Sequence, residues 1–261
     1  MNEGFFVSGT DTGVGKSVVS AALVAGLVDI GTRVDVMKPV QSGETIEVVS
    51  EVPPVTFDGL ADDVLLWEAS DRSVARDDIV MHRFTAPLAP SVAADQGEDG
   101  INIDQIIGSI RDRCADSFAV VEGVGGWRVW LDEENQVCDL ARAASLPVLI
   151  VAANRLGAIN HTVLTVDAIL DDGLDVAGIV LNDRSPHPPS EEVGAMETNA
   201  NEIAKRTGLP VWRFSYLDAM TVDTLRRAGR ALLAQIGQTS GDRQSDMSRQ
   251  QPDVPPTTES V

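Results

Sequence analysis

The chain has 261 residues, with 40 Asp and Glu against 20 Lys and Arg, which gives a formal net charge of −20 and a sequence pI of about 4.3. This balance excludes a basic nucleic-acid binder, because the sequence holds no positive stripe that would neutralise phosphates. Apolar runs recur along most of the chain, so it is not a disordered acidic polymer either, and we expect one globular domain over residues 1–237.

Short β-type runs alternate with amphipathic helical patterns along the chain. The predicted strands are Phe5–Val7, Val34–Met37, Phe118–Val121, Val148–Ala152, Val176–Leu181 and Val211–Phe214. The predicted helices are Lys16–Asp29, Ile103–Cys114, Asn160–Asp171, Glu191–Thr207 and Thr221–Ile236. This alternation predicts an α/β fold, a parallel sheet with helices on both faces that binds ligands at the carboxyl ends of its strands. Glu44–Gly59 is expected to be a surface loop and residues 238–261 a disordered polar tail.

Only three of the basic residues are lysines, namely Lys16, Lys38 and Lys205. The acidic excess and the scarcity of lysine indicate adaptation to a high-salt cytoplasm, where strong screening removes most of the repulsion between carboxylates. The two cysteines are too few for a disulfide scaffold. The N-terminus lacks an apolar leader, and the longest apolar run, Val148–Ala153, is too short to cross a bilayer. We therefore expect a cytoplasmic protein that contacts no membrane.

A glycine-rich segment joins the first predicted strand to the first predicted helix. Residues 7–17 are Val-Ser-Gly-Thr-Asp-Thr-Gly-Val-Gly-Lys-Ser. In such a loop the backbone N–H groups and the helix N-terminus point at phosphate, Lys16 reaches the β and γ phosphates, and the Ser17 hydroxyl ligates Mg²⁺. Five residues separate Gly9 from Gly15, where the general motif has four. The segment predicts a P-loop NTPase-like fold that binds a nucleotide.

A second lysine follows the second predicted strand, at the same edge of the sheet. Lys38 opens the segment Lys-Pro-Val-Gln-Ser-Gly, residues 38–43. A lysine before a proline turn is ordinarily a surface residue. Here, however, two of only three lysines would converge on one pocket. We expect Lys38 to hold negative charge between an anionic nucleophile and a phosphoryl group.

Carboxylates are expected at the same edge. Glu122 ends the third predicted strand, and the glycines at 123, 125 and 126 permit close approach of a ligand, which favours a Mg²⁺ ligand over a solvated strand end. A second acid would come from Asp62 or Asp63, for which capping of a helix is nearly as good an explanation.

Two later segments add candidate binding groups. Asn182 and Asp183 close the fifth predicted strand, where a side-chain amide can contact adenine, although Asn-Asp is also ordinary turn chemistry. Residues 154–162 open a helix whose free N–H groups can hold a carboxylate. His161 in that segment has no nucleophile nearby and is more typical of capping or packing.

Together these segments resemble the dethiobiotin synthetase family, from about Phe5 to Leu217. The shared motifs are residues 9–17, residues 38–43, Pro87-Leu-Ala-Pro-Ser91, Glu122-Gly-Val-Gly-Gly-Trp127, Leu156-Gly-Ala-Ile-Asn-His161 and Asn182-Asp183. The five-residue spacing of the phosphate loop is this family's own version. Ser17 replaces a more usual Thr and keeps the hydroxyl, whereas Ser91 stands where relatives often carry His.

The resemblance implies an ATP- and Mg²⁺-dependent ligase of biotin biosynthesis, acting as a homodimer. In that reaction CO₂ and 7,8-diaminononanoate give an N-carbamate, ATP phosphorylates the carbamate, and the second amine closes the ureido ring with loss of phosphate.

The resemblance also implies roles for individual residues. Lys16 and Lys38 would be catalytic, and Ser17, Asp63 and Glu122 would surround Mg²⁺. Nucleotide contacts would come from Thr12, Gly13, Val14, Gly15, Lys16, Ser17, Asp63, Glu122, Gly123, Val124, Gly125, Asn182, Asp183, Phe214, Ser215 and Tyr216. Ser42 would contact the diamine or carbamate, and the helix start at Gly157 and Asn160 would bind the substrate carboxylate across the dimer interface.

Three alternatives compete with this interpretation. A partition or division-site ATPase carries an extra lysine early in the phosphate loop, where this chain has Asp11. A cobyrinic acid amidase-like synthetase would need room for a glutaminase domain. A catalytically idle nucleotide-binding module would predict the loss of Lys38 or Glu122, and both are present.

Overall fold

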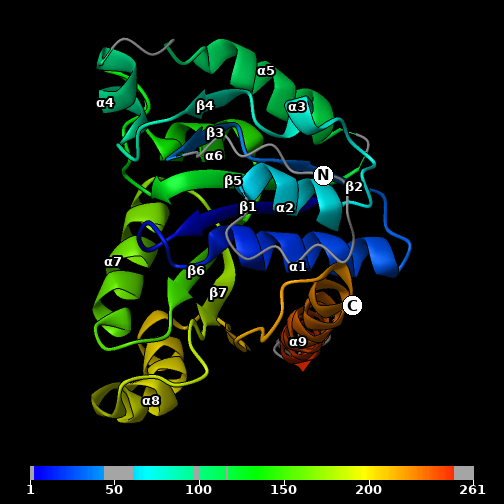
Figure 1. Cartoon of the computed structure of the whole chain (residues 1–261). Helices are drawn as coiled ribbons and strands as arrows, with labels where there is room; N and C mark the ends of the chain where they lie inside the picture. The colour runs from blue at the N-terminus through cyan, green and yellow to red at the C-terminus, as the bar shows by residue number, and fades with distance from the viewer. Residues whose placement is uncertain (1–2, 44–60, 97–99, 116, 250–261) are drawn as a thin grey trace, which may run out of the picture.

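The computed structural model describes residues 3–43, 61–96, 100–115 and 117–249. Six strands form one sheet in the order β2 (Val34–Met37), β5 (Phe118–Gly126), β1 (Gly4–Gly9), β6 (Val148–Ala153), β7 (Val176–Asn182) and β8 (Val211–Phe214). Every neighbouring pair in this sheet is parallel (Figure 1). The central strands are buried on both faces, and accordingly β6 and β7 are nearly continuous runs of Val, Ile, Leu and Ala.

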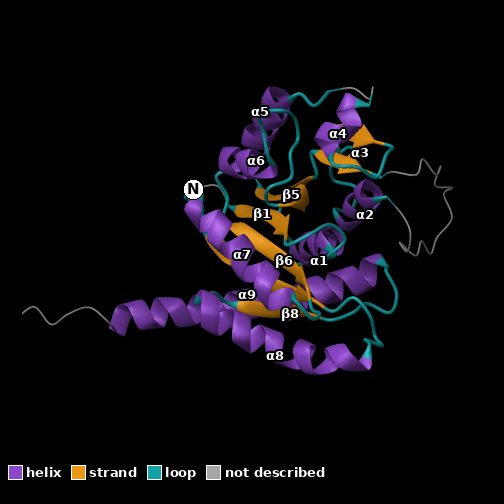
Figure 2. Cartoon of the chain, turned by 90° about the vertical axis from the view of Figure 1, so that its left-hand side faces the viewer, coloured by secondary structure: helices purple, strands orange, loops and turns teal. Residues whose placement is uncertain are grey.

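Helices cover both faces of the sheet, as Figure 2 shows. One apolar cluster packs α5 (Ile103–Arg113), α6 (Val137–Ala144), α7 (Ala158–Asp171) and α8 (Ser190–Thr207) on one face. A second cluster packs α1 (Lys16–Asp29), α2 (Asp62–Ala69) and α9 (Val222–Arg249) on the other. The predicted fold class, a P-loop-type α/β sheet with helices on both faces, is confirmed. No helix of the described ranges is long and apolar enough to span a bilayer.

A small second sheet lies beside the carboxyl edge of the main one. Its strands β3 (Val40–Ser42) and β4 (His82–Phe84) pair in parallel, and the short helices α3 (Arg76–Ile79) and α4 (Pro90–Asp95) flank them. Segments of three to six residues are too short to show a periodicity, so the sequence did not predict them. Residues of these elements and of the loop between them form part of the wall of a cavity at that edge.

The main elements agree with their predicted positions to within two residues, with two larger differences. Strand β5 continues from Val121 to Gly126, because the glycines after Glu122 stay in the sheet with an irregular register. Helix α9 continues to Arg249, past the predicted boundary of the domain at residue 237, so residues 238–249 of the predicted disordered tail are helical instead. The predicted loop Glu44–Gly59 and the tail beyond Arg249 lie outside the described residues.

Helices α1 and α9 cross at a pair of glycines. A Cβ atom on Gly229 would lie 1.8 Å from the Ala22 carbonyl oxygen, and one on Gly26 would lie 2.6 Å from the Gly229 carbonyl carbon. The two backbones therefore touch directly. This crossing fixes α1, which begins at the phosphate loop, against the C-terminal helix.

We predict that Gly229→Ala lowers the free energy of unfolding by about 2–3 kcal/mol, because the new methyl group overlaps backbone that cannot move away easily. Gly194→Ala in α8 is the matched control, since its Cβ would meet nothing within 4 Å. Removing that exposed helical glycine should raise stability by about 0.5–1 kcal/mol. Urea denaturation of the two variants measures both effects; equal stability of Gly229→Ala and the unaltered chain would show that the crossing is loose.

Candidate active site

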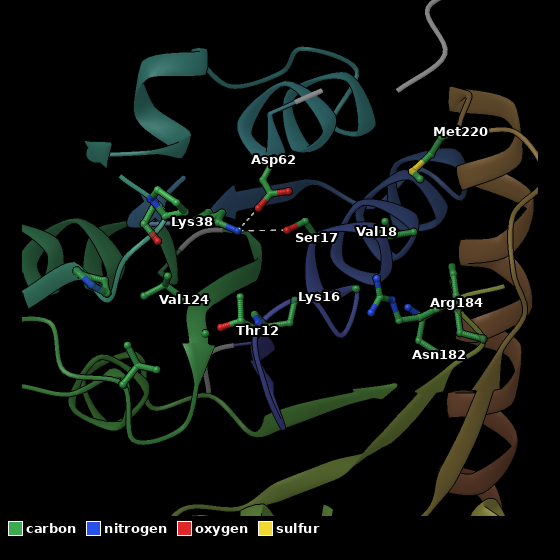
Figure 3. A pocket seen from close by; sticks show the side chains of 18 of the residues that line it. Thr12, Lys16, Ser17, Val18, Lys38, Asp62, Val124, Asn182, Arg184 and Met220 are labelled. Atoms are coloured by element: carbon green, nitrogen blue, oxygen red, sulfur yellow. Dashed lines mark hydrogen bonds and ion pairs between the residues drawn. The ribbon is translucent and has the colours of Figure 1, made fainter. Parts of the chain in front are cut away.

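A cavity of about 530 Å³ opens at the carboxyl ends of the strands, where parallel sheets bind their ligands. Its wall combines the phosphate loop, the second sheet and the segment after β8. The lining residues are Thr12, Gly13, Gly15, Lys16, Ser17, Val18, Lys38, Ser42, Asp62, Pro87, Leu88, Ala89, Pro90, Val124, Gly125, Val129, Asn182, Asp183, Arg184, Phe214, Tyr216, Leu217 and Met220 (Figure 3).

The phosphate loop joins β1 to α1 and forms the floor of the cavity. Gly13 and Gly15 have φ values of 70° and 94°, a left-handed conformation that a residue with a side chain adopts only with strain. A Cβ on Gly15 would also lie 2.0 Å from the Asn182 Nδ2 atom. That Nδ2 atom donates a 2.9 Å hydrogen bond to the Val14 carbonyl oxygen. The loop is therefore braced by the end of β7, and its N–H groups face the cavity at the start of a helix.

Lys16 stands at the first position of α1 and is buried. Its ammonium donates a 3.1 Å hydrogen bond to the Asp11 carbonyl oxygen, which folds the side chain back over the loop. The pKa of Lys16 is lowered to about 8, mainly because the side chain is buried. The negative charge of Glu122 raises this pKa, whereas the positive charge of Lys38 lowers it further. A phosphate in the loop would favour the charged form of this lysine, since an opposite charge nearby raises the pKa of an ammonium.

Lys38 lies at the centre of a polar cluster that we name the Lys38 cluster: Lys38, Ser17, Asp62 and Glu122. The ammonium lies 2.8 Å from Glu122 Oε1, 2.5 Å from Asp62 Oδ2 and 3.2 Å from Ser17 Oγ. Ser17 donates a 2.7 Å hydrogen bond to the same Glu122 oxygen. Figure 3 shows Lys38 pointing toward both Ser17 and Asp62. The cluster joins β5, α1, α2 and the end of β2 at one point.

The charges within this cluster support one another. Burial alone lowers the pKa of Lys38, but the charges of Glu122 and Asp62 outweigh it and hold that pKa above its ordinary value. Burial likewise raises the pKa of Asp62, while the neighbouring Lys38 ammonium more than reverses this and lowers it. Lys38 is therefore a permanent cation at neutral pH, and Asp62 is a permanent anion.

The structure corrects the position of the predicted second acid. Asp63 was expected beside Ser17 and Glu122, but Asp62 lies there. The Asp63 side chain is fully buried on another side of α2, where its Oδ2 atom lies 2.7 Å from Arg76 Nε and 3.1 Å from Arg83 Nη2. Consecutive helical residues point about 100° apart, so only one of the two aspartates can face the cavity.

The donor set of the Lys38 cluster fits a magnesium ion. Glu122 Oε2 is buried and has no hydrogen-bond partner among the described residues. Together with Ser17 Oγ and the Asp62 carboxylate it offers only hard oxygen atoms, which Mg²⁺ prefers. The described part of the chain has no cluster of three or more His, Cys, Asp and Glu residues for a metal. Mg²⁺ does not require one, because it is commonly held by one or two carboxylates together with substrate phosphates and water.

The other end of the cavity is built from the ends of β7 and β8. Asn182 is buried beneath the phosphate loop, and Asp183 is held by Asn154 Nδ2 at 2.7 Å and Arg213 Nη2 at 3.0 Å. Phe214 and Tyr216 line this end, as predicted. With its Nδ2 atom bound to Val14, Asn182 keeps its Oδ1 atom as an acceptor for the amino group of a base.

Some predicted binding residues do not line the cavity. Gly123 packs into the core, where a Cβ would lie 2.8 Å from a Val137 methyl group. Gly157 and Asn160 lie at the start of α7, outside the lining of this chain's own cavity. Val14 and Ser215 are also absent from the lining, although Val14 contributes its carbonyl oxygen to the bond with Asn182. Asp63 and Glu122 are fully buried and do not line the cavity either, although Glu122 contacts the lining residues Ser17 and Lys38.

Other lining residues were not predicted as contacts. They are Val18, Val129, Arg184, Leu217, Met220 and the stretch Pro87–Pro90, of which only the Pro-Leu-Ala-Pro motif gave a signal in the sequence; Asp62, which also lines the cavity, was named in the sequence only as the alternative to Asp63. Val124 and Gly125, which were predicted, reach the cavity because β5 advances from Glu122 to Gly126 while β1 advances only from Val7 to Gly9. Such a bulge pushes the extra residues out of the ladder.

Comparisons with known proteins agree with this geometry. A family model described as an AAA domain matches residues 3–212. The ATP-dependent dethiobiotin synthetase BioD of Bacillus subtilis is 39% identical over 211 residues, which are 80% of this chain and 84% of the relative. The enzyme of the same name from Anaeromyxobacter dehalogenans is 42% identical over 205 residues, 78% of this chain and 85% of the relative. The enzyme of the same name from Marinobacter nauticus is 36% identical over 211 residues, which are 79% of this chain and 84% of the relative.

Among solved structures, the signal recognition particle receptor FtsY from Elizabethkingia anophelis superposes with a TM-score of 0.45 and 12% sequence identity. The superposition covers 88% of this chain and 66% of that chain.

We predict that Lys38→Met lowers the free energy of unfolding by about 3 kcal/mol, because Glu122 is left as an uncompensated buried charge. Adding Glu122→Gln should recover part of this loss, since it removes the charge that has no partner. Lys205→Met, a change of the same type on the exposed side of α8, should shift stability by less than about 0.5 kcal/mol. Denaturation curves of these variants test the prediction, and a Lys38→Met chain as stable as Lys205→Met would contradict it.

Proposed function

The chain belongs to the family of ATP-dependent dethiobiotin synthetases, and from this we propose that it carboxylates 7,8-diaminononanoate with CO₂ and closes the ureido ring at the expense of ATP. The products are dethiobiotin, ADP and phosphate, and the enzyme is a C–N ligase of biotin biosynthesis. The observation that carries this proposal is the Lys38 cluster, a buried ammonium set beside a phosphate loop within an otherwise strongly anionic protein.

The reaction needs positive charge at one place. A carbamate forms when one amine of the substrate attacks CO₂, and it is a weak nucleophile that must approach the γ-phosphoryl group of ATP although both carry negative charge. We assign to Lys38 the task of holding the carbamate, and to Lys16 that of holding the γ-phosphate. Neutralising and aligning the two partners stabilises the transition state of the transfer.

The later steps require little from the protein beyond position. Attack of the carbamate oxygen on the γ-phosphorus releases ADP and leaves a carbamic–phosphoric anhydride. The second amine then attacks the carbonyl carbon, the C–N bond forms, and phosphate departs with the C–O bond electrons. Ser42 lines the cavity on the side of the second sheet, where we assign it contact with the diamine or carbamate.

Ser17, Asp62 and Glu122 would hold a magnesium ion, as the hard-oxygen donor set indicates. Bound Mg²⁺ would neutralise charge on the β and γ phosphates. Asp62 replaces the predicted Asp63 in this set because Asp63 is already engaged by two arginines. The Lys38 ammonium lies between these oxygens and keeps two carboxylates close together that would otherwise repel each other.

The remaining assignments follow the same geometry. We propose that Asn182 binds adenine, with Asp183, Phe214 and Tyr216 around the base. The N–H groups at the start of α7, near Gly157 and Asn160, would bind the carboxylate of a substrate in the partner subunit of a homodimer, since they lie outside this chain's own cavity. A cytoplasmic location and an adaptation to high salt stay predictions from the composition.

We predict that phosphate release from ATP with Mg²⁺ and bicarbonate depends strictly on 7,8-diaminononanoate, because in the proposed reaction the γ-phosphoryl group is transferred to the carbamate that forms from this diamine. Lys38→Met should lower kcat by about 100-fold or more, the usual effect of removing a group that stabilises transition-state charge. Assays in molar KCl, with circular dichroism to check folding, compare it with Lys205→Met, which should keep full activity.

Two results would contradict the proposed function. Phosphate release indifferent to the diamine would point to a switch ATPase, and a folded Lys38→Met enzyme with normal turnover would remove the assigned role of that lysine.

A further inference from the structure

We propose that Asp63 is a positioning residue: held by Arg76 and Arg83, it fixes the first turn of α2 so that the adjacent Asp62 carboxylate faces the active site. This inference rests on the role proposed above for Asp62 in holding Mg²⁺. Asp63 itself does not line the cavity, and its side chain is hydrogen-bonded to Arg76 and Arg83 and not to Lys38.

The contacts of Asp63 are those of a buried anchor. Its side chain is fully buried, and its Oδ2 atom accepts hydrogen bonds from Arg76 Nε at 2.7 Å and from Arg83 Nη2 at 3.1 Å. Arg83 also donates to the Val80 carbonyl oxygen at 3.0 Å. One carboxylate oxygen thus joins the start of α2 to α3 and to β4. Burying the Asp63 carboxylate costs free energy of desolvation. A role of this carboxylate in the active site would account for that cost.

Helix α2 lacks the usual means of fixing its first turn. Ala61 is at the N-cap and offers no side-chain acceptor, so only its carbonyl oxygen receives the N–H groups of Val64 at 3.1 Å and Leu65 at 3.3 Å. Most helices hold this turn with a Ser, Thr, Asp or Asn cap. In α2 the side chains of the first two helical residues do so instead.

Two ion pairs in two directions set the rotation of α2 about its axis. Asp62 meets Lys38 on one side, and Asp63, about 100° further round the helix, meets the two arginines on another. A rotation of α2 that moved Asp63 away from its arginines would also displace Asp62 from its position beside Lys38. The Asp63 pair therefore keeps the Asp62 carboxylate at the place where its oxygens can reach both Lys38 and a metal ion near Ser17.

The same anchor links the metal side of the cavity to the substrate side. Arg83 lies in β4, whose partner strand β3 carries Ser42, with Arg83 opposite Gln41 and Phe84 opposite Ser42. Asp63 thus ties the strand pair behind Ser42 to the helix that carries Asp62. Asp63 therefore connects the helix that would help to hold the metal ion with the strand whose Ser42 would contact the diamine or carbamate.

The test compares three charge-removing variants of the full-length protein: Asp63→Asn, Asp62→Asn and the double variant. Asp35→Asn is the matched control, because Asp35 forms a half-buried pair with Arg113 at 3.0 Å that joins β2 to α5 rather than to α2. The first readout is the Kd of Mn²⁺ in the presence of a saturating non-hydrolysable ATP analogue, from the electron paramagnetic resonance signal of free Mn²⁺. The second is the Mg²⁺ concentration that gives half-maximal turnover, with kcat at saturating Mg²⁺.

We expect Asp63→Asn to raise the Kd of Mn²⁺ by about tenfold, the usual effect of losing a group that orients a metal ligand. The half-saturating Mg²⁺ concentration should rise in parallel while kcat at saturation changes by less than about twofold. The double variant should bind Mn²⁺ no more weakly than Asp62→Asn alone, because Asp63 acts only through Asp62. Asp35→Asn should lower Tm without changing the Kd.

A folded Asp63→Asn protein with unaltered Mn²⁺ affinity, or effects of the two single variants that add, would overturn the inference and leave Asp63 a structural residue. Unaltered affinity in Asp62→Asn would overturn the proposed metal role of Asp62 as well, so the two failures are distinguishable. If Asp63→Asn does not fold, Arg83→Lys takes its place; it keeps the charge but loses the planar fork, and should shift the Kd in the same direction.

Discussion

The active site depends on one interaction, the burial of the Lys38 ammonium between the carboxylates of Glu122 and Asp62. Lys38 and Glu122 are buried, and an unpaired charge of either sign would be costly at that depth, so each of these two needs the other, while the partly exposed Asp62 adds a second negative charge beside Lys38. Their joint presence brings together the end of β2, the middle of β5 and the start of α2. Ser17, the last residue of the phosphate loop, joins the same cluster through its hydrogen bonds to Glu122 and Lys38.

The surrounding fold fixes the parts of this cluster independently. Glu122 lies in β5, where its backbone is paired with Val7 of β1, directly after the last pair between β5 and β2, Val121 with Met37. Helix α1 packs closely against α9 where Gly26 and Gly229 meet. The phosphate loop is held by the hydrogen bond from Asn182 to the Val14 carbonyl oxygen. Asp62 begins helix α2, whose N-cap residue makes no side-chain hydrogen bond, and we propose that its neighbour Asp63 compensates for this. A site whose groups must align a weak nucleophile with a phosphoryl group gains directly from such rigidity.

The sequence predicted the sheet and its ligand edge because buried parallel strands leave long apolar runs and phosphate loops have a fixed order of glycines, lysine and hydroxyl. Lys38 could be found because lysine is rare in this chain. The choice between Asp62 and Asp63 could not be made, since it depends on where Arg76 and Arg83 lie in space. Arg184, Leu217 and Met220 carry no local signal, and they reach the cavity only because β7 and β8 end side by side.

The most direct test of the proposed roles of the Lys38 cluster is a crystal structure of the protein with Mg²⁺, a non-hydrolysable ATP analogue, bicarbonate and 7,8-diaminononanoate. We expect a metal ion bound by Ser17, Asp62 and Glu122. The Lys38 ammonium should lie within hydrogen-bond distance of the carbamate, and Asp63 should remain paired with Arg76 and Arg83. A metal ion bound by Asp63, or a carbamate out of reach of Lys38, would contradict these roles.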